Sequence, residues 1–140
     1  MFRAHGYLAH SKAIELMRSA DLLFLPMQDL PSGTRAGLVP GKTYEYLASG
    51  RPILAAVPDG DARDLLAAAG DVYLCRPADV TAIVNAIEHA VGRWRTGASF
   101  LPRGPDVLAP YERRYQTRQL AALLDGVVGG GRSRLSLAQA

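Results

Sequence analysis

Short apolar runs along this chain alternate with longer segments in which apolar residues recur every three or four positions. The runs at residues 22–25, 53–57 and 71–75 are too short for helices and have the composition of buried strands. Strands that alternate with helices build parallel sheets. The pattern therefore predicts an α/β fold with three parallel strands, which is half of a doubly wound sheet.

The segments between and after these runs predict the helices. Their periodicity places helices over residues 12–19, 42–49, 62–69, 80–91 and 111–128. Polar residues able to cap a helix N-terminus precede three of them: Ser11, Asp61 (with Asp64 in the reciprocal position) and Asp79. Glycines that favour a helix end follow: Gly50, Gly70 and the run 129–131. We expect one partial domain over residues 1–128 and a disordered tail over residues 129–140.

Helical periodicity predicts which faces of two helices are buried. In the helix over residues 42–49, the core face is expected to carry Tyr44, Leu47 and Ala48, and the other face Lys42 and Glu45. In the helix over residues 80–91, the apolar stripe expected to face the sheet consists of Ile83, Ala86, Ile87 and Ala90.

The loop before the helix over residues 42–49 is unusually long. It runs over residues 27–41, about fifteen residues, which exceeds the usual length of a strand–helix connection. Loops of that length are usually functional or disordered. In parallel sheets, ligands bind beyond the carboxyl ends of the strands and against helix N-termini. We therefore expect the functional site at this loop and at the start of the helix.

Three residues at the start of this helix have chemistry suited to a nucleotide diphosphate. Gly41 and Lys42 offer backbone N–H groups and an ammonium group where an anion would bind. The carboxylate of Glu45 is favoured by the helix dipole and can accept hydrogen bonds from a sugar diol. The alternative at this point is that Lys42 and Glu45 are a solvated surface pair.

The sequence contains no motif typical of several other kinds of binding or catalytic site. There is no P-loop, no dinucleotide-binding glycine fingerprint, no cluster of metal ligands, and no set of nucleophile, histidine and acid. The one cysteine, Cys75, excludes a disulfide framework and a cysteine-based metal site. Its place at the end of a predicted strand favours a buried thiol. We expect no cofactor and no metal.

Two segments carry a resemblance to a known family. The segment ADLLFLP over residues 20–26, followed by VPGKTYEYLASGRPILA over residues 39–55, resembles the group 1 (family 4) glycosyltransferases. These are retaining enzymes of the GT-B architecture, and the similarity is to their C-terminal, nucleotide-sugar-binding domain. Residues 6–8 and 58–62 resemble the flanking segments of the polysaccharide-building branch. The resemblance covers residues 5–91 and implies a partial Rossmann-like parallel sheet with flanking helices.

The resemblance implies a role for the residues at the helix start. Glu45 matches the glutamate that holds the donor ribose hydroxyls, and Gly41 and Lys42 match the helix start that faces the diphosphate. The loop that lies along the donor in the family is matched here by Leu38, Val39 and Pro40. The nucleotide diphosphate sugar is the donor substrate, so the resemblance adds no cofactor.

The resemblance also implies contacts further from the helix. Gly6 and Tyr7 match the turn near the nucleobase, and His10 would border that pocket unless it is a surface or helix-capping residue. Arg35 would reach a phosphate, with a solvated loop arginine as the alternative. One departure is Gly37, which stands where the family often has a glutamate directed toward the donor sugar.

The activity that the resemblance implies is transfer of a sugar from a nucleotide diphosphate sugar to a polysaccharide or lipid-linked acceptor. The family's acceptor-binding domain and the first strands of its donor domain have no counterpart in this sequence, so we interpret the chain as a fragment that is inactive alone. A missing N-terminal region or a second copy would cover the open sheet edge. The alternative is a non-catalytic nucleotide-binding or protein-interaction module derived from that fold.

Composition and charge indicate which cellular compartment and which binding partners to expect. Hydrophobic residues make up 49% of the 140 residues and charged residues 21%, as in ordinary globular proteins. No apolar run approaches a membrane span and residues 1–25 do not resemble a signal peptide, so we expect a cytoplasmic protein. The net charge of +3 is mild, and the arginines gather late in the chain. They favour an anionic membrane surface or phosphate-bearing ligands, not nucleic acid, with a solvated basic face as the alternative.

Overall fold

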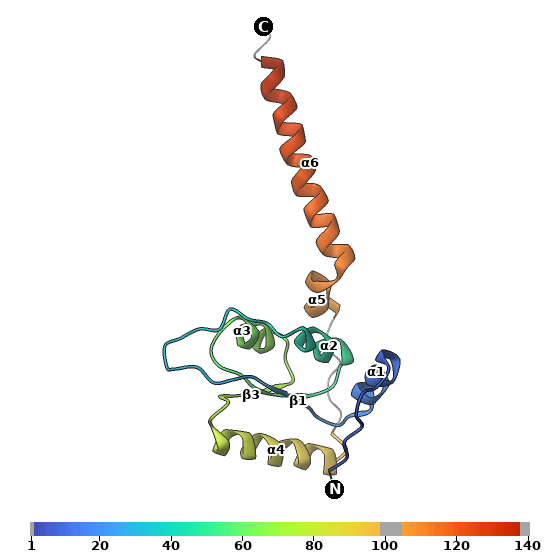
Figure 1. The fold of residues 1–140 in the computed structure, drawn as a ribbon, viewed down its shortest axis with the longest axis vertical. Coiled ribbons are helices and arrows are strands. Elements are labelled where there is room, and N and C mark those ends of the chain that lie inside the picture. Colours follow the sequence, from blue (N-terminus) through green and yellow to red (C-terminus); the bar gives the residue numbers. More distant parts are fainter. Residues whose placement is uncertain (1, 99–104, 138–140) are drawn as a thin grey trace. The chain divides into compact units, whose positions relative to one another are not determined.

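The computed structural model describes residues 2–98 and 105–137 (Figure 1). The chain divides into two compact units, the first ending at Gly104 and the second beginning at Pro105. Each unit has its own secondary structure and is described by itself below. The sheet and the candidate site lie in the first unit.

A three-stranded parallel sheet forms the centre of the first unit. The strands β1 (Leu23–Pro26), β2 (Ile53–Ala56) and β3 (Val72–Cys75) lie in the order β1-β2-β3. Leu23 is paired with Ile53, and Ile53 with Val72. The predicted α/β fold with a partial parallel sheet is therefore confirmed. The central strand β2 is buried at every position because it has a neighbour on each side and helices on both faces, which explains its unbroken apolar sequence.

The edge strand β1 is less buried than its apolar sequence predicts. Leu23 and Leu25 are buried, but Phe24 is 50% exposed. The register places Phe24 on the same face as Leu54 of the central strand. Helix α4 (Val80–Arg95) packs on this face against β2 and β3. The side chain of Phe24 at the edge is therefore left half uncovered.

Helices cover both faces of the sheet. Helices α2 (Gly41–Ser49) and α3 (Asp61–Ala68) lie on the face opposite α4, and α1 (His10–Ser19) lies beside α2 (Figure 1). On the α4 face, Leu54 and Cys75 pack with Ala86. On the other side, Leu47 of α2 and Leu66 of α3 are completely buried. These contacts make a three-layer α/β/α arrangement.

Only one of the three predicted helix caps is present. Asp79 accepts a hydrogen bond from the Ala82 N–H at 2.9 Å and caps α4 as predicted. Helix α1 instead begins at His10 with Ala9 at the N-cap, so the cap at Ser11 is wrong. Helix α3 begins at Asp61 with Gly60 at the N-cap, because the backbone of this turn pairs with the loop before α2. Asp61 is thus inside the helix, and its predicted cap is also wrong.

The buried faces of α2 and α4 differ from their predicted positions. In α2 the core residues are Thr43 and Leu47, whereas Tyr44 and Ala48 lie at the exposed side. Helix α4 continues to Arg95, and its buried residues are Ala86 and Ala90. Ile87, predicted to face the sheet, is 42% exposed because the sheet is only three strands wide and contacts a narrow stripe of the helix.

Thr43 carries a buried hydroxyl group for which the described residues supply no hydrogen-bond partner. The residue is completely buried, and no donor or acceptor of the described residues forms a hydrogen bond with its Oγ1. An unsatisfied buried hydroxyl costs on the order of 1–3 kcal/mol, whereas a methyl group of the same shape costs nothing. We therefore expect Thr43→Val to raise the free energy of unfolding by about 1 kcal/mol. Thermal unfolding beside Thr43→Ser, which keeps the hydroxyl, would check this; a loss of stability in Thr43→Val would contradict it.

The second unit is helical. It contains α5 (Pro105–Leu108), a 3₁₀ turn η1 (Ala109–Tyr111) and α6 (Arg113–Leu137). The predicted helix end at glycines 129–131 is wrong, since α6 continues through them; each glycine costs a helix about 1 kcal/mol but does not forbid it. Residues 129–137 of the predicted disordered tail therefore belong to α6, and residues 138–140 lie outside the described residues. Within the described part of the chain, no helix combines the length and apolar character needed to cross a membrane.

Candidate functional site

An open cleft of about 510 Å³ lies at the carboxyl ends of β1 and β2. Its walls are the residues that follow β1, the later part of the loop before α2, and the turn after β2. The lining residues are Pro26, Met27, Gln28, Leu30, Ala36, Gly37, Leu38, Pro40 and Pro58. We refer to this space as the carboxyl-edge cleft. It lies where parallel sheets generally bind ligands.

The N-terminus of α2 opens beside this cleft. Pro40 lines the cleft and is also the N-cap residue of α2. Gly41 and Lys42 follow it as the first two residues of the helix, and both are exposed. Their backbone N–H groups have no partner within the helix and carry the positive end of its dipole. An anion in the cleft would therefore meet a favourable potential at this end.

The loop before α2 is held in place by a backbone bridge to Gly60. Ala36 N–H donates to the Asp59 carbonyl oxygen at 2.8 Å, and Asp61 N–H donates to the Ala36 carbonyl oxygen at 2.9 Å. Gly60 adopts φ 149°, and a Cβ atom there would overlap the Ala36 carbonyl oxygen. Glycine is required because the two backbones approach so closely. This bridge positions Gly37 and Leu38 at the cleft.

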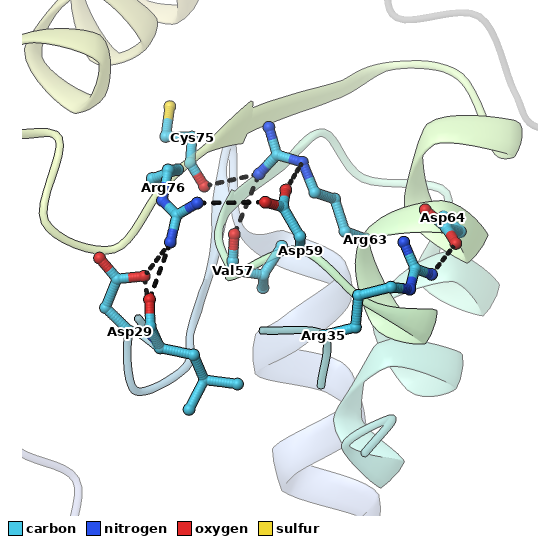
Figure 2. Close-up of polar contacts among 9 residues, drawn as sticks. Asp29, Arg35, Val57, Asp59, Arg63, Asp64, Cys75 and Arg76 are labelled. Atoms are coloured by element: carbon cyan, nitrogen blue, oxygen red, sulfur yellow. Dashed lines mark hydrogen bonds and ion pairs between the residues drawn. The ribbon is translucent and has the colours of Figure 1, made fainter. Parts of the chain in front are cut away.

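Arg76 ties the first part of the same loop to the ends of β2 and β3 (Figure 2). Its Nη2 donates to Asp29 Oδ1 at 2.9 Å and to the Leu30 carbonyl oxygen at 3.0 Å. Its Nη1 donates to Asp59 Oδ2 at 3.1 Å. A planar guanidinium can make these three bonds at once because its donors point in fixed, divergent directions. Arg76 thus holds two loops together with one side chain.

A second arginine, Arg63 of α3, extends this cluster (Figure 2). Its Nη1 donates to the carbonyl oxygens of Val57 at 3.0 Å and Cys75 at 3.2 Å, and its Nε lies 3.6 Å from Asp59 Oδ1. The carbonyls lie at the ends of the neighbouring strands β2 and β3, where the Cys75 oxygen also accepts a hydrogen bond from the Val57 N–H at 3.0 Å. We call Asp29, Asp59, Arg63 and Arg76 the carboxyl-edge clamp.

Two groups in or next to the clamp have a shifted pKa. Burial raises the pKa of Asp29, but the hydrogen bonds from Arg76 and from the Leu30 N–H outweigh it and leave this pKa below its ordinary value of 3.8. Burial, with a smaller contribution from the charge of Asp79, raises the pKa of the Cys75 thiol. Cys75 is buried, as predicted.

Arg35 is engaged within the protein. Its Nη2 donates to Asp64 Oδ2 at 2.6 Å (Figure 2). The same nitrogen lies 3.9 Å from Asp61 Oδ1. The hydrogen bond from Arg35 to Asp64 also raises the pKa of the arginine. Asp64 is therefore used to anchor the loop to α3, and the guanidinium of Arg35 would have to leave it in order to reach a phosphate.

Glu45 lies one turn into α2, with its side chain exposed. It is not among the residues that line the cleft, so a ligand would have to extend out of the cleft along α2 to reach it. The next residue, Tyr46, is half-buried; burial raises its pKa, and the negative charge of Glu45 raises it further. Val39 lies between two cleft-lining residues and is half-buried.

The segment before α1 contributes no residue to the lining of the cleft. Gly6 is exposed in a left-handed turn, and Tyr7 is completely exposed. His10 is the first residue of α1 and is exposed. None of the three is among the lining residues. Of the ten predicted site residues, the cleft thus brings together Leu38 and Pro40 directly, with Val39, Gly41 and Lys42 next to them in the chain.

Sequence reasoning missed the carboxyl-edge clamp. Arg76 directly follows β3, and Asp29 lies three residues after the end of β1, so both stand at the carboxyl edge of the sheet, with β2 between their strands. Polar residues in that position were the available signal. Among the described residues, no group of three or more histidine, cysteine or acidic side chains is placed to hold a metal ion.

Comparisons with known proteins give this chain no relative. No protein-family model, no curated protein and no solved structure matches it.

Proposed function

We propose that this chain forms the donor-binding part of a retaining glycosyltransferase of the GT-B type. The observation that carries the proposal is the carboxyl-edge cleft, which is lined by Leu38 and Pro40 and lies at the N-terminus of α2. The proposal places a nucleotide diphosphate sugar there. The motif over residues 39–55 supports this placement because it contains the cleft-lining residue Pro40 and the helix start that follows it.

The chemistry of the helix start matches the two polar parts of such a donor. The diphosphate would accept hydrogen bonds from the exposed N–H groups of Gly41 and Lys42, with the Lys42 ammonium group supplying a positive charge. The exposed carboxylate of Glu45 would accept hydrogen bonds from the two ribose hydroxyls. Transfer would then depend on electrostatic stabilisation of the departing diphosphate, and it needs neither a protein nucleophile nor a metal.

The acceptor in this proposal is a polysaccharide or a lipid-linked sugar at the cytoplasmic face of a membrane. The acceptor site would come from a further region or a second copy of the chain, which would also cover the exposed edge of β1. The arginines of α6 would favour an anionic lipid surface. The 140 residues alone are therefore expected to bind the donor nucleotide without transferring sugar.

A non-catalytic nucleotide-binding module is the second candidate, and two observations favour it. Gly37 lines the cleft and provides no carboxylate for the donor sugar. Arg35 is held by Asp64 and does not project a free charge toward a phosphate. Both candidates place the nucleotide in the same cleft, and they differ only in whether an assembled enzyme transfers the sugar.

Calorimetric titration with uridine diphosphate and guanosine diphosphate tests the proposed site. We expect one of them to bind, and Glu45→Ala to weaken that binding about tenfold, which equals about 1.4 kcal/mol, because a charged hydrogen bond to the ribose is lost. Glu88→Ala is the matched control, since Glu88 is another exposed helical glutamate, on α4. Equal affinities for the wild type and Glu45→Ala would remove Glu45 from the site. No binding by the folded chain would reject the proposed site.

A further inference from the structure

The lining of the carboxyl-edge cleft contains one polar side chain, that of Gln28. This residue is exposed, and none of the described residues forms a hydrogen bond with its side-chain amide. The other lining residues are apolar, apart from Gly37, which has no side chain. A ligand in the cleft therefore meets apolar side chains and a single amide group.

The backbone of the cleft adds few hydrogen-bond donors. Three of the lining residues are prolines and have no N–H group: Pro26, Pro40 and Pro58. The N–H groups of three more already donate to partners within the protein, and these residues are Met27, Leu30 and Ala36. A ligand group that carries many hydroxyls thus finds few partners here. A ligand group with an apolar part is favoured, because the cleft removes that part from water.

The proposed function determines which part of the donor lies in this cleft. A nucleotide diphosphate sugar has the linear order sugar, diphosphate, ribose and base. The proposed site binds the ribose at Glu45 and the diphosphate at Gly41 and Lys42, the start of α2. Pro40 precedes them and lines the cleft, whereas Glu45 does not line it. The part of the donor that enters the cleft is therefore the sugar.

We propose that the donor sugar carries an acetamido group at C2 and that the carboxyl-edge cleft binds this group. C2 is next to the carbon that carries the diphosphate, so its substituent lies close to the N-terminus of α2. The Gln28 amide donates a hydrogen bond to the acetamido carbonyl oxygen, and Leu38 and Pro40 cover the acetyl methyl group. This inference rests on the proposed function, because it concerns the sugar of the same donor.

A hydroxyl group at C2 gains less from the same cleft. It can also form a hydrogen bond with Gln28, but it has no methyl group to place against Leu38 and Pro40. Burial of one methyl group strengthens binding by a factor of about five. The cleft thus distinguishes the two sugars mainly through its apolar wall.

Calorimetric titration of the full chain with uridine diphosphate glucose and uridine diphosphate N-acetylglucosamine tests this inference. The two compounds differ only in the substituent at C2. The corresponding guanosine pair is used if guanosine diphosphate is the nucleotide that binds. We expect the acetamido donor to bind at least about fivefold more tightly than the glucose donor. This comparison uses the wild type and needs no variant.

Two variants test where the acetamido group lies. Leu38→Asn removes an apolar contact and is expected to reduce the preference for the acetamido donor to less than about twofold. Leu120→Asn is the matched control, because Leu120 is another exposed leucine, on α6, and this variant should keep the full preference. Gln28→Ala is expected to weaken binding of the acetamido donor about fivefold, because one hydrogen bond is lost. Circular dichroism checks that each variant is folded.

The outcomes separate this inference from the proposed function. The inference would be overturned, and the proposed function kept, if the nucleotide diphosphate bound but the two donors had equal affinity. A preference that Leu38→Asn leaves unchanged, or an acetamido donor that binds Gln28→Ala as tightly as the wild type, would also overturn it. If the folded chain bound neither nucleotide nor donor, the proposed function and this inference would both be rejected.

Discussion

Gly60→Ala is expected to lower the free energy of unfolding by about 3 kcal/mol, because it combines backbone strain with a steric overlap. The φ of 149° at Gly60 is unfavourable for any residue with a side chain. The added Cβ would also overlap the Ala36 carbonyl oxygen. That oxygen is backbone and accepts the Asp61 N–H, so it cannot move without breaking the bridge.

Urea unfolding of Gly60→Ala beside Gly37→Ala measures this effect. Gly37 lies in the loop at the same bridge, but a Cβ there meets no atom within 4 Å, and its φ is not positive. We therefore expect Gly37→Ala to change the free energy of unfolding by less than about 0.5 kcal/mol. If the two variants were equally stable, the close approach of Ala36 and Gly60 would not exist in solution.

Arg76→Ala is expected to lower the free energy of unfolding by about 2 kcal/mol. The substitution removes three hydrogen bonds and leaves Asp29, Asp59 and the Leu30 carbonyl oxygen without their shared donor. The Arg76 side chain is one-third exposed, so water can replace some of the hydrogen bonds that the substitution removes. The loss of stability is therefore expected to be smaller than for the removal of one partner of a fully buried ion pair. Arg76→Lys should recover less than half of the loss, because an ammonium group cannot bond both loops in the same directions.

The contribution of Arg76 also depends on pH in a defined direction. The folded-state pKa of Asp29 lies below its ordinary value of 3.8, so the ionised carboxylate stabilises the folded protein above that pH. This stability is lost as the pH falls through the lowered, folded-state pKa. The difference in unfolding free energy between the wild type and Arg76→Ala should therefore be constant near neutral pH and shrink below about pH 3.8. A difference that does not change down to the acid transition would contradict the Asp29–Arg76 pair.

The secondary structure of the first unit was largely predictable because its signals are local. The runs at 22–25, 53–57 and 71–75 coincide with β1, β2 and β3, and Gly50 ends α2 in the left-handed conformation. The burial of single residues was less predictable. Phe24 and Ile87 have the sequence context of core residues, yet they are half exposed because the sheet has three strands and α4 covers two of them. The width of a sheet is not encoded in any one strand.

The location of the candidate site was predictable, but the hydrogen bonds and ion pairs that hold it were not. The length of the loop and the position of α2 pointed to the carboxyl edge, where the cleft lies. The clamp was not predicted, because Asp29 and Arg76 are 47 residues apart and no local pattern pairs them. The ion pair between Asp64 and Arg35 was not predicted for the same reason, because the two residues are 29 positions apart. The local pattern around Asp64 indicated a helix-capping role instead.

The carboxyl-edge clamp has a consequence for the order in which the protein folds and opens. The bonds that tie the loop to the turn after β2 and to the end of β3, which are those of Ala36 with Asp59 and Asp61 and that of Arg76 with Asp29, join segments far apart in the sequence. Such bonds can form only after the sheet has brought the strand ends together, since closing long loops costs entropy before any contact offsets it. We therefore expect the carboxyl-edge cleft to become ordered after the sheet, and to open more readily than the sheet in the folded protein. Hydrogen exchange at the Ala36 amide should be faster than at the amides of β2, and a ligand bound in the cleft would slow it selectively.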